Sequence, residues 1–204
     1  HEPETAPVDL YLGVDCSGSM GNPAHHLSYP VLAGTIIALS ALRAGSRVKV
    51  VLSGEPGQTV STPGFERGAL TVMKTLTSYL GTGTSFGIHR LSETFAGDPR
   101  RSSGPKPRPV HILIVSDNDM FSMLDSKSKR ESGWQVAERA VKHAGGGATF
   151  VLELPAHVRG PHGPQNTGGY LECIEQIGWN ASIVSSMEEL VEFARRFSGG
   201  RFGL

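Results

Sequence analysis

A short stretch of acidic and hydroxyl side chains is the part of the sequence best suited to chemistry. It reads Asp15-Cys16-Ser17-Gly18-Ser19-Met20 and lies between an apolar run and a long apolar helical pattern. Asp15, Ser17 and Ser19 offer hard oxygen ligands to a divalent cation, and they leave part of its coordination shell open. The plainer alternative is a strand-to-helix turn whose hydroxyls cap the next helix.

Two further loops carry oxygen ligands of the same kind. Thr82 and Thr84 lie in the glycine-rich segment 81–85, and Asp117 follows the apolar run 110–116. None of these candidate ligands is His or Cys, so zinc is disfavoured and Mg²⁺ or Mn²⁺ is favoured, with Ca²⁺ as a further candidate. Two carboxylates are few for a site built from protein ligands alone. Mg²⁺ in such a site keeps several waters or accepts a ligand from elsewhere, and an acidic side chain of a partner would fill that position.

Strand and helix patterns alternate around these loops. The apolar patterns predict strands at 9–14, 47–52, 58–61, 110–116, 148–154 and 181–184, and helices at 29–43, 69–80, 86–95, 132–143, 170–177 and 187–197. Polar loops are predicted at 118–129 and 155–169, and both follow strands. This order predicts an α/β fold with a doubly wound, mostly parallel central sheet flanked by helices, in which strand 58–61 is antiparallel. Ligands of such sheets bind at the carboxyl ends of the strands, where the three loops can meet.

Composition limits the class of protein. The chain has 204 residues and a formal net charge of zero, with 38% hydrophobic and 19% charged residues. We expect a globular domain. Nucleic acid is disfavoured as a partner because phosphate binding needs a basic surface, and no apolar run approaches the roughly 18 residues of a membrane span. Cys16 and Cys173 are the only cysteines, which favours reduced thiols and a cytoplasmic location. We expect residues 1–8 to be a linker or the edge of a longer protein, 9–198 the domain and 199–204 a tail.

Taken together, the three loops resemble the metal-ion-dependent adhesion site of von Willebrand factor A (vWA) domains. The resemblance rests on Asp15-x-Ser17-x-Ser19, on the threonines of the glycine-rich loop, and on an Asp that closes an apolar strand. It covers nearly the whole chain, because the order of strands and helices also fits the Rossmann-like vWA fold. The sequence departs from the family at 117–119, where Asp-Asn-Asp replaces the frequent Asp-Gly and makes the loop more acidic.

The resemblance implies a metal-binding role for residues of all three loops. Ser17 and Ser19 would bind the metal directly, and Asp15 and Asp117 would bind it directly or through water. One threonine of the glycine-rich loop would complete the protein ligands.

Thr84 is the favoured threonine, because Gly83-Thr84-Ser85-Phe86 resembles the form found in bacterial members of the family. Thr82 is the alternative. Asp119 is a candidate for a supporting contact outside the ligand shell.

The resemblance also implies a non-catalytic module whose bound metal takes an Asp or Glu side chain from a protein partner. Cytosolic bacterial members often work with AAA+ ATPases, including the MoxR class and chelatase complexes, so an ATPase-linked complex is the expected setting. One alternative is an extracellular adhesin or matrix-binding domain with the same metal chemistry. A second is a metal-dependent hydrolase, which would need a base beside the metal; the sequence places neither His25 nor His26 there and contains no evident catalytic set.

Overall fold

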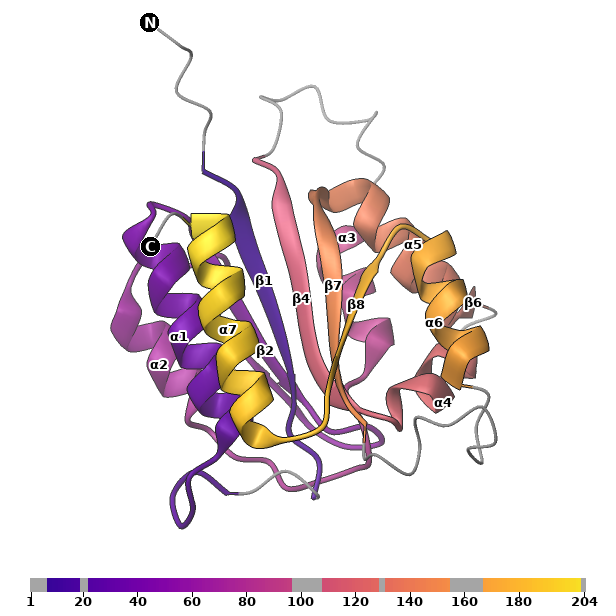
Figure 1. Ribbon diagram of the computed structural model, residues 1–204, viewed down its shortest axis with the longest axis horizontal. Helices are drawn as coiled ribbons and strands as arrows, with labels where there is room; N and C mark the ends of the chain where they lie inside the picture. The colour runs from indigo at the N-terminus through magenta and orange to yellow at the C-terminus, as the bar shows by residue number, and fades with distance from the viewer. Residues whose placement is uncertain (1–6, 19–21, 97–107, 129–130, 155–166, 203–204) are drawn as a thin grey trace, which may run out of the picture.

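The sheet at the centre of the protein has six strands in the order β3-β2-β1-β4-β7-β8 (Figure 1). Their bounds are β1 Asp9–Asp15, β2 Val48–Ser53, β3 Thr59–Ser61, β4 Val110–Asp117, β7 Gly145–Glu153 and β8 Asn180–Val184. All neighbours pair in parallel except β2 and β3, which pair antiparallel. The computed structural model describes residues 7–18, 22–96, 108–128, 131–154 and 167–202, and of 201–202 only the backbone. The predicted mostly parallel sheet, with its one antiparallel strand, is confirmed.

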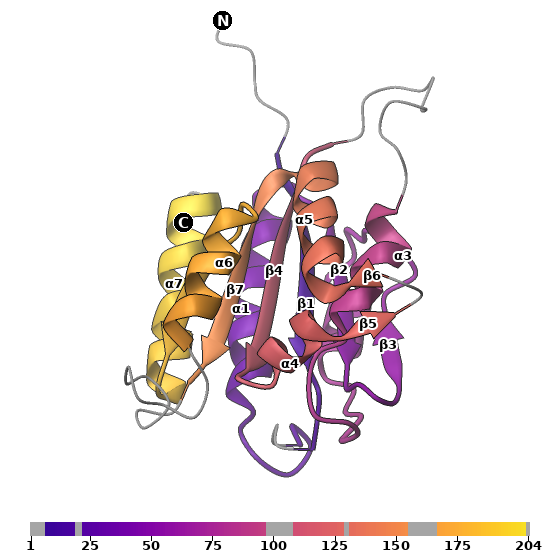
Figure 2. The same ribbon diagram turned by 90° about the vertical axis from the view of Figure 1, so that its right-hand side faces the viewer.

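Helices cover both faces of the sheet (Figure 1). One face is covered by α1 (Tyr29–Arg43), α2 (Ala69–Leu76) and α7 (Met187–Phe202). The other is covered by the 3₁₀ helix η1 (Ile88–Arg90), α3 (Leu91–Phe95), α4 (Met120–Asp125), α5 (Gly133–Ala144) and α6 (Thr167–Gln176). A small hairpin of β5 (Lys127–Ser128) and β6 (Glu131–Ser132) lies at the start of α5 (Figure 2). Among the described residues, no helix combines the length and apolar character needed to cross a membrane.

The apolar character of the central strands follows from this layering. Every residue of β1 is buried, and β4 is buried up to its last residue, because each strand is covered on both faces. The side chains of β1 alternate between two cores, with Leu10 and Leu12 facing α1 and Tyr11 facing α3.

The strand order changes direction between β1 and β4. From β1 the chain crosses through α1 to β2, on one side of β1, whereas from β4 it crosses through α5 to β7, on the other side. The loops that leave β1 and β4 therefore run in opposite directions along the carboxyl edge of the sheet. Asp15 and Asp117, the last residues of these two strands, lie at this switch point, where doubly wound proteins bind their ligands.

Several elements differ from the sequence-based prediction. Strand β7 begins at Gly145 and not at 148, and the helix predicted at 86–95 is the 3₁₀ helix η1 followed by the short α3. Helix α2 ends at Leu76 and not near 80, because the hydroxyls of Thr77 and Ser78 donate to carbonyls of the preceding turn. The polar loop predicted at 118–129 is wrong in part, since it contains α4, which buries Met120, Phe121 and Leu124. Helix α6 begins at Thr167, and α7 continues beyond 197 to Phe202. Most of the loop predicted at 155–169 lies outside the described residues.

Candidate metal centre

Asp15 lies at the end of β1 with its carboxylate buried and held on both sides. Only 1% of the residue is exposed. Oδ1 accepts a hydrogen bond of 2.8 Å from the backbone N–H of Ser17, and Oδ2 accepts one of 2.8 Å from Oγ of Ser116 on β4. One oxygen is therefore fixed by the loop that follows β1 and the other by the neighbouring strand, so the carboxylate has a defined orientation at the switch point.

The surroundings of Asp15 disfavour its negative charge when no cation is present. Burial raises the pKa of Asp15 to about 6, and the nearby charge of Asp117 adds to the rise, while hydrogen bonds from Ser17 and Ser116 oppose it. None of the Lys and Arg side chains that the structure describes forms an ion pair with Asp15. A divalent cation would supply the missing positive charge, so the electrostatics fit the metal site that the sequence predicts.

The glycine-rich loop packs directly against the loop that follows β1. The N–H of Gly81 donates to the carbonyl of Cys16 at 3.1 Å, and the N–H of Gly18 donates to the carbonyl of Gly83 at 3.5 Å. The buried Cys16 also accepts a 3.1 Å hydrogen bond at Sγ from the N–H of Leu80. The structure thus brings the first two predicted loops together, and Cys16 acts as a packed spacer between them.

The two threonines of this loop have different surroundings. Thr84 is exposed, and its Oγ1 donates to the carbonyl of Glu55 at 3.3 Å, which engages the hydroxyl proton and leaves the oxygen lone pairs for a cation. The Oγ1 of Thr82 is buried without a hydrogen-bond partner among the described residues. It packs toward Gly57, where an added Cβ would stand 2.9 Å from it. The surroundings of Thr84 suit a ligand in an open site, and those of Thr82 suit a packed side chain.

The third loop joins the other two through β4. Asp117 is half-buried, and its Oδ1 accepts a 2.9 Å hydrogen bond from the N–H of Asp119, which precedes α4. The adjacent Ser116 is the residue that holds Asp15. Ser17 is fully buried beside Asp15, and Ser19 lies outside the described residues. The loop after β4 therefore meets the loop after β1 at the same edge of the sheet where the glycine-rich loop meets it.

Two further residues of this edge are not marked by any pattern in the sequence. Ser116 reads as the last residue of an apolar strand, and its role depends on the β1–β4 register, which sequence alone does not fix. Glu153 ends β7 and pairs in register with Asp117. Burial raises the pKa of Glu153, and the charge of Asp117 raises it further. No group of three or more His, Cys, Asp and Glu side chains in the described part of the chain is arranged to hold a metal.

Comparison with known proteins adds evidence at the level of the fold. No family model matches the sequence, and no curated protein matches it. Among solved structures, the pilus adhesin SpaC of Lactobacillus rhamnosus GG in its open conformation is similar with a TM-score of 0.63 and 13% identity, over 98% of this chain and 30% of the adhesin. Manganese-loaded TRAP protein of Plasmodium vivax is similar with a TM-score of 0.57 and 19% identity, over 94% of this chain and 73% of TRAP.

A third similar structure is nearly the same length as this chain. It is an aerotolerance-related membrane protein of Bacteroides fragilis, with a TM-score of 0.56 and 12% identity over 95% of this chain and 99% of that one. This chain spans about a third of the length of the pilus adhesin that it matches. Together with the sheet order and the flanking helices, these similarities show that the chain has the Rossmann-like vWA fold.

Proposed function

We propose that this domain is a divalent-metal-dependent protein-binding module. Mg²⁺ or Mn²⁺, with Ca²⁺ as a further candidate, is held by Asp15, Ser17, Ser19, Thr84 and Asp117, and it takes an Asp or Glu side chain from a protein partner. The observation that carries the proposal is the buried carboxylate of Asp15, oriented at both oxygens and lacking a cationic partner among the described side chains. The bound metal would supply a positive centre with an open coordination position, and the residues around it would orient its ligands.

Comparison with solved structures supports a binding or adhesion role. The similar structures include a pilus adhesin and a protein crystallised with manganese. The similarity to the pilus adhesin favours a second candidate function, that of an adhesin or matrix-binding domain with the same metal chemistry. An AAA+ ATPase as the partner, and a cytoplasmic location, stay predictions from the sequence resemblance.

The loop between β1 and α1 offers a surface beside the proposed metal. Ala24, His25, His26 and Leu27 are exposed, and Leu27 has 66% of its surface accessible. Asn22 orders this loop, because its side chain accepts from the N–H of Ala24 and its carbonyl accepts from those of His25 and His26. An exposed leucine on an ordered loop suits an apolar contact at the margin of an interface whose centre is the metal.

Metal binding can be tested by isothermal titration calorimetry of the metal-free protein with MnCl₂ and MgCl₂. We expect saturable metal binding by the wild type and none by Asp15→Ala. The closer isostere Asp15→Asn separates loss of a metal ligand from loss of the fold. Circular dichroism checks that both variants are folded. Equal metal affinity of the wild type and both variants would refute the proposal.

The partner can be tested by affinity capture from the native host with the wild type and Asp15→Asn as paired baits. We expect a protein that is retained with Mg²⁺, released by EDTA and absent from the Asp15→Asn bait. Its acidic residues can then be substituted one at a time. Capture that is equal with metal, with EDTA and with Asp15→Asn would contradict metal-dependent recognition.

A further inference from the structure

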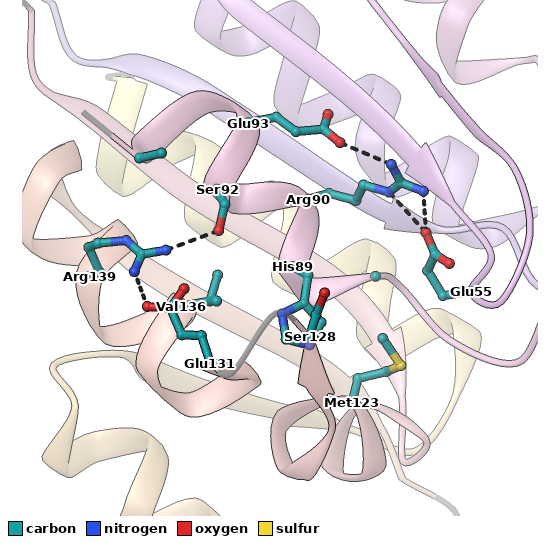
Figure 3. A pocket seen from close by; sticks show the side chains of 12 residues that line it. Glu55, His89, Arg90, Ser92, Glu93, Met123, Ser128, Glu131, Val136 and Arg139 are labelled. Atoms are coloured by element: carbon teal, nitrogen blue, oxygen red, sulfur yellow. Dashed lines mark hydrogen bonds and ion pairs between the residues drawn. The ribbon is translucent and has the colours of Figure 1, made fainter.

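A cleft of about 740 Å³ opens on the face of the sheet that carries α3 and α5 (Figure 3). Its walls bear two arginines, each in an ion pair with at least one acidic side chain. Arg90 of η1 contacts Glu55 and Glu93, and Arg139 of α5 contacts Glu131 and also donates to Ser92. The two arginines lie on separate parts of the cleft wall (Figure 3). None of the proposed metal ligands lines this cleft. One lining residue, however, also contacts the glycine-rich loop.

That residue is Glu55, whose side chain is held by Arg90. Nε and Nη2 of Arg90 both donate to Oε1 of Glu55, at 2.9 and 2.5 Å. The two side chains are 32% and 22% exposed, so the pair is partly shielded from water. Charge-assisted hydrogen bonds from a guanidinium group are directional as well as strong. Arg90 therefore fixes both the position and the direction of the Glu55 side chain.

The backbone of Glu55 contacts the loop that carries Thr84. Its N–H donates to the carbonyl of Ser85 at 2.8 Å, and its carbonyl accepts from the N–H of Thr84 at 2.9 Å and from Oγ1 of Thr84 at 3.3 Å. The two segments are also closely packed, because a Cβ added to Gly87 would stand 2.4 Å from Cγ of Glu55. Glu55 thus links the cleft, through its side chain, to the Thr84 hydroxyl, through its backbone.

We infer that Arg90 is a positioning residue of the candidate metal centre, which acts by holding Glu55 and through it the glycine-rich loop. The inference deepens the proposed function. Its effect on Mn²⁺ affinity rests on that function, because it requires that the domain binds a metal. Residues outside the ligand shell that orient ligands typically change metal affinity by about 10- to 100-fold when they are replaced. Because Arg90 acts through one intermediate residue, we place Arg90→Gln at the lower end, about 10-fold.

Arg139 provides a matched control in the same cleft. Arg139→Gln removes a guanidinium group from a similar partly buried ion pair, but its contacts, Glu131 and Ser92, lie outside the glycine-rich loop. Glu93→Gln is a second control, because it removes the other partner of Arg90 and leaves the Glu55 contact in place. Arg90→Lys keeps the charge and tests how much the forked geometry of the guanidinium contributes.

The experiment combines amide hydrogen exchange of the metal-free protein with Mn²⁺ titration of the same variants. For Arg90→Gln and Glu55→Gln we expect faster exchange of the backbone amides at positions 55 and 84 and about 10-fold weaker Mn²⁺ binding. Arg90→Lys should have exchange rates and a Mn²⁺ affinity between those of the wild type and Arg90→Gln. The Arg90→Gln/Glu55→Gln double variant should bind Mn²⁺ only slightly more weakly than either single variant. Arg139→Gln and Glu93→Gln should match the wild type in both measurements.

The two readouts separate this inference from the proposed function. If the wild type binds no metal, the proposed function fails, while the exchange rates still report whether Arg90 holds the loop. If Arg90→Gln leaves the exchange of the Glu55 and Thr84 amides unchanged, or if Arg139→Gln changes both readouts as much as Arg90→Gln, the positioning role is refuted.

Discussion

Oγ of Ser116 donates a 2.8 Å hydrogen bond to Oδ2 of Asp15, so the strand that leads into the third loop holds the carboxylate of the first. This bond crosses from β4 to β1 at the point where the strand order changes direction. It fixes one carboxylate oxygen while Ser17 fixes the other. The orientation of the proposed metal ligand therefore depends on two strands whose sequence positions are far apart.

We predict that Ser116→Ala weakens Mn²⁺ binding by roughly 10-fold, because the Asp15 carboxylate loses the donor that orients it. Calorimetric titration of the folded variant measures the change. Ser40→Ala is the control: Ser40 is also buried, and its hydroxyl donates to the carbonyl of Ile36 within α1, away from the metal edge. Equal Mn²⁺ affinities for the two variants would show that the Ser116 contact has no part in metal binding.

Asp15 makes the stability of the metal-free protein depend on pH. Its pKa rises from 3.8 to about 6 on folding, so between these values the folded state binds more protons than the unfolded state. The free energy of unfolding must then fall as pH rises through this window, by up to about 3 kcal/mol for a shift of this size. We predict that Asp15→Asn removes this dependence and makes the metal-free protein more stable than the wild type at pH 7.

Urea unfolding of wild type and Asp15→Asn at several pH values between 4 and 7.5 tests this prediction. Added Mg²⁺ should stabilise the wild type at pH 7 and have progressively less effect as pH falls below 6, because protons compete for the carboxylate. Parallel pH profiles for the two proteins would show that the folded-state pKa of Asp15 is close to that of the unfolded chain.

Much of this arrangement could be predicted from the sequence because it depends on local patterns. The apolar runs of β1 and β4 and the turn residues that follow them identify the strands, and the alternation of strands and helices identifies the layered sheet. Helix α5 lies within one residue of the range predicted at 132–143, and the structure shows that Ser132 and Gln135 form a capping box at its start and that Gly145 closes it with φ +68°.

The rest depends on contacts between distant segments, which local patterns do not reveal. Ser116 is distinguished from other strand residues only by the register of β4 against β1, and Glu153 only by that of β7 against β4. Helix α4 was missed because its three buried apolar residues are few for a periodic pattern. The role inferred for Arg90 depends on the fold of the segment around Glu55, where the chain brings residues 35 positions apart into contact.

The choice between Thr84 and Thr82 can be decided by a pair of near-isosteric variants. We predict that Thr84→Val lowers Mn²⁺ affinity at least 10-fold, because it removes a hydroxyl whose proton is engaged by Glu55 and whose lone pairs are available. Thr82→Val should leave the affinity near that of the wild type, and it should keep or slightly raise stability, because it removes a buried hydroxyl that has no partner among the described residues. Calorimetry and urea unfolding measure both effects, and the reverse ranking of affinities would make Thr82 the ligand.

The glycines of the 54–57 turn allow the glycine-rich loop to lie close to the end of β2. A Cβ added at Gly54 would stand 1.8 Å from the carbonyl oxygen of Thr82, so it would collide with the backbone of the glycine-rich loop, and at 3.3 Å it would also be in tight contact with the carbonyl oxygen of Cys16. We predict that Gly54→Ala lowers the free energy of unfolding by about 1 to 3 kcal/mol and also weakens Mn²⁺ binding, since the loop must move away. Gly64→Ala is the control, because a Cβ there has no neighbour within 4 Å and should leave stability unchanged or raise it by up to about 1 kcal/mol. Urea unfolding and Mn²⁺ titration of the two variants test the prediction; if Gly54→Ala behaves like Gly64→Ala, close packing of this turn does not hold the loop in place.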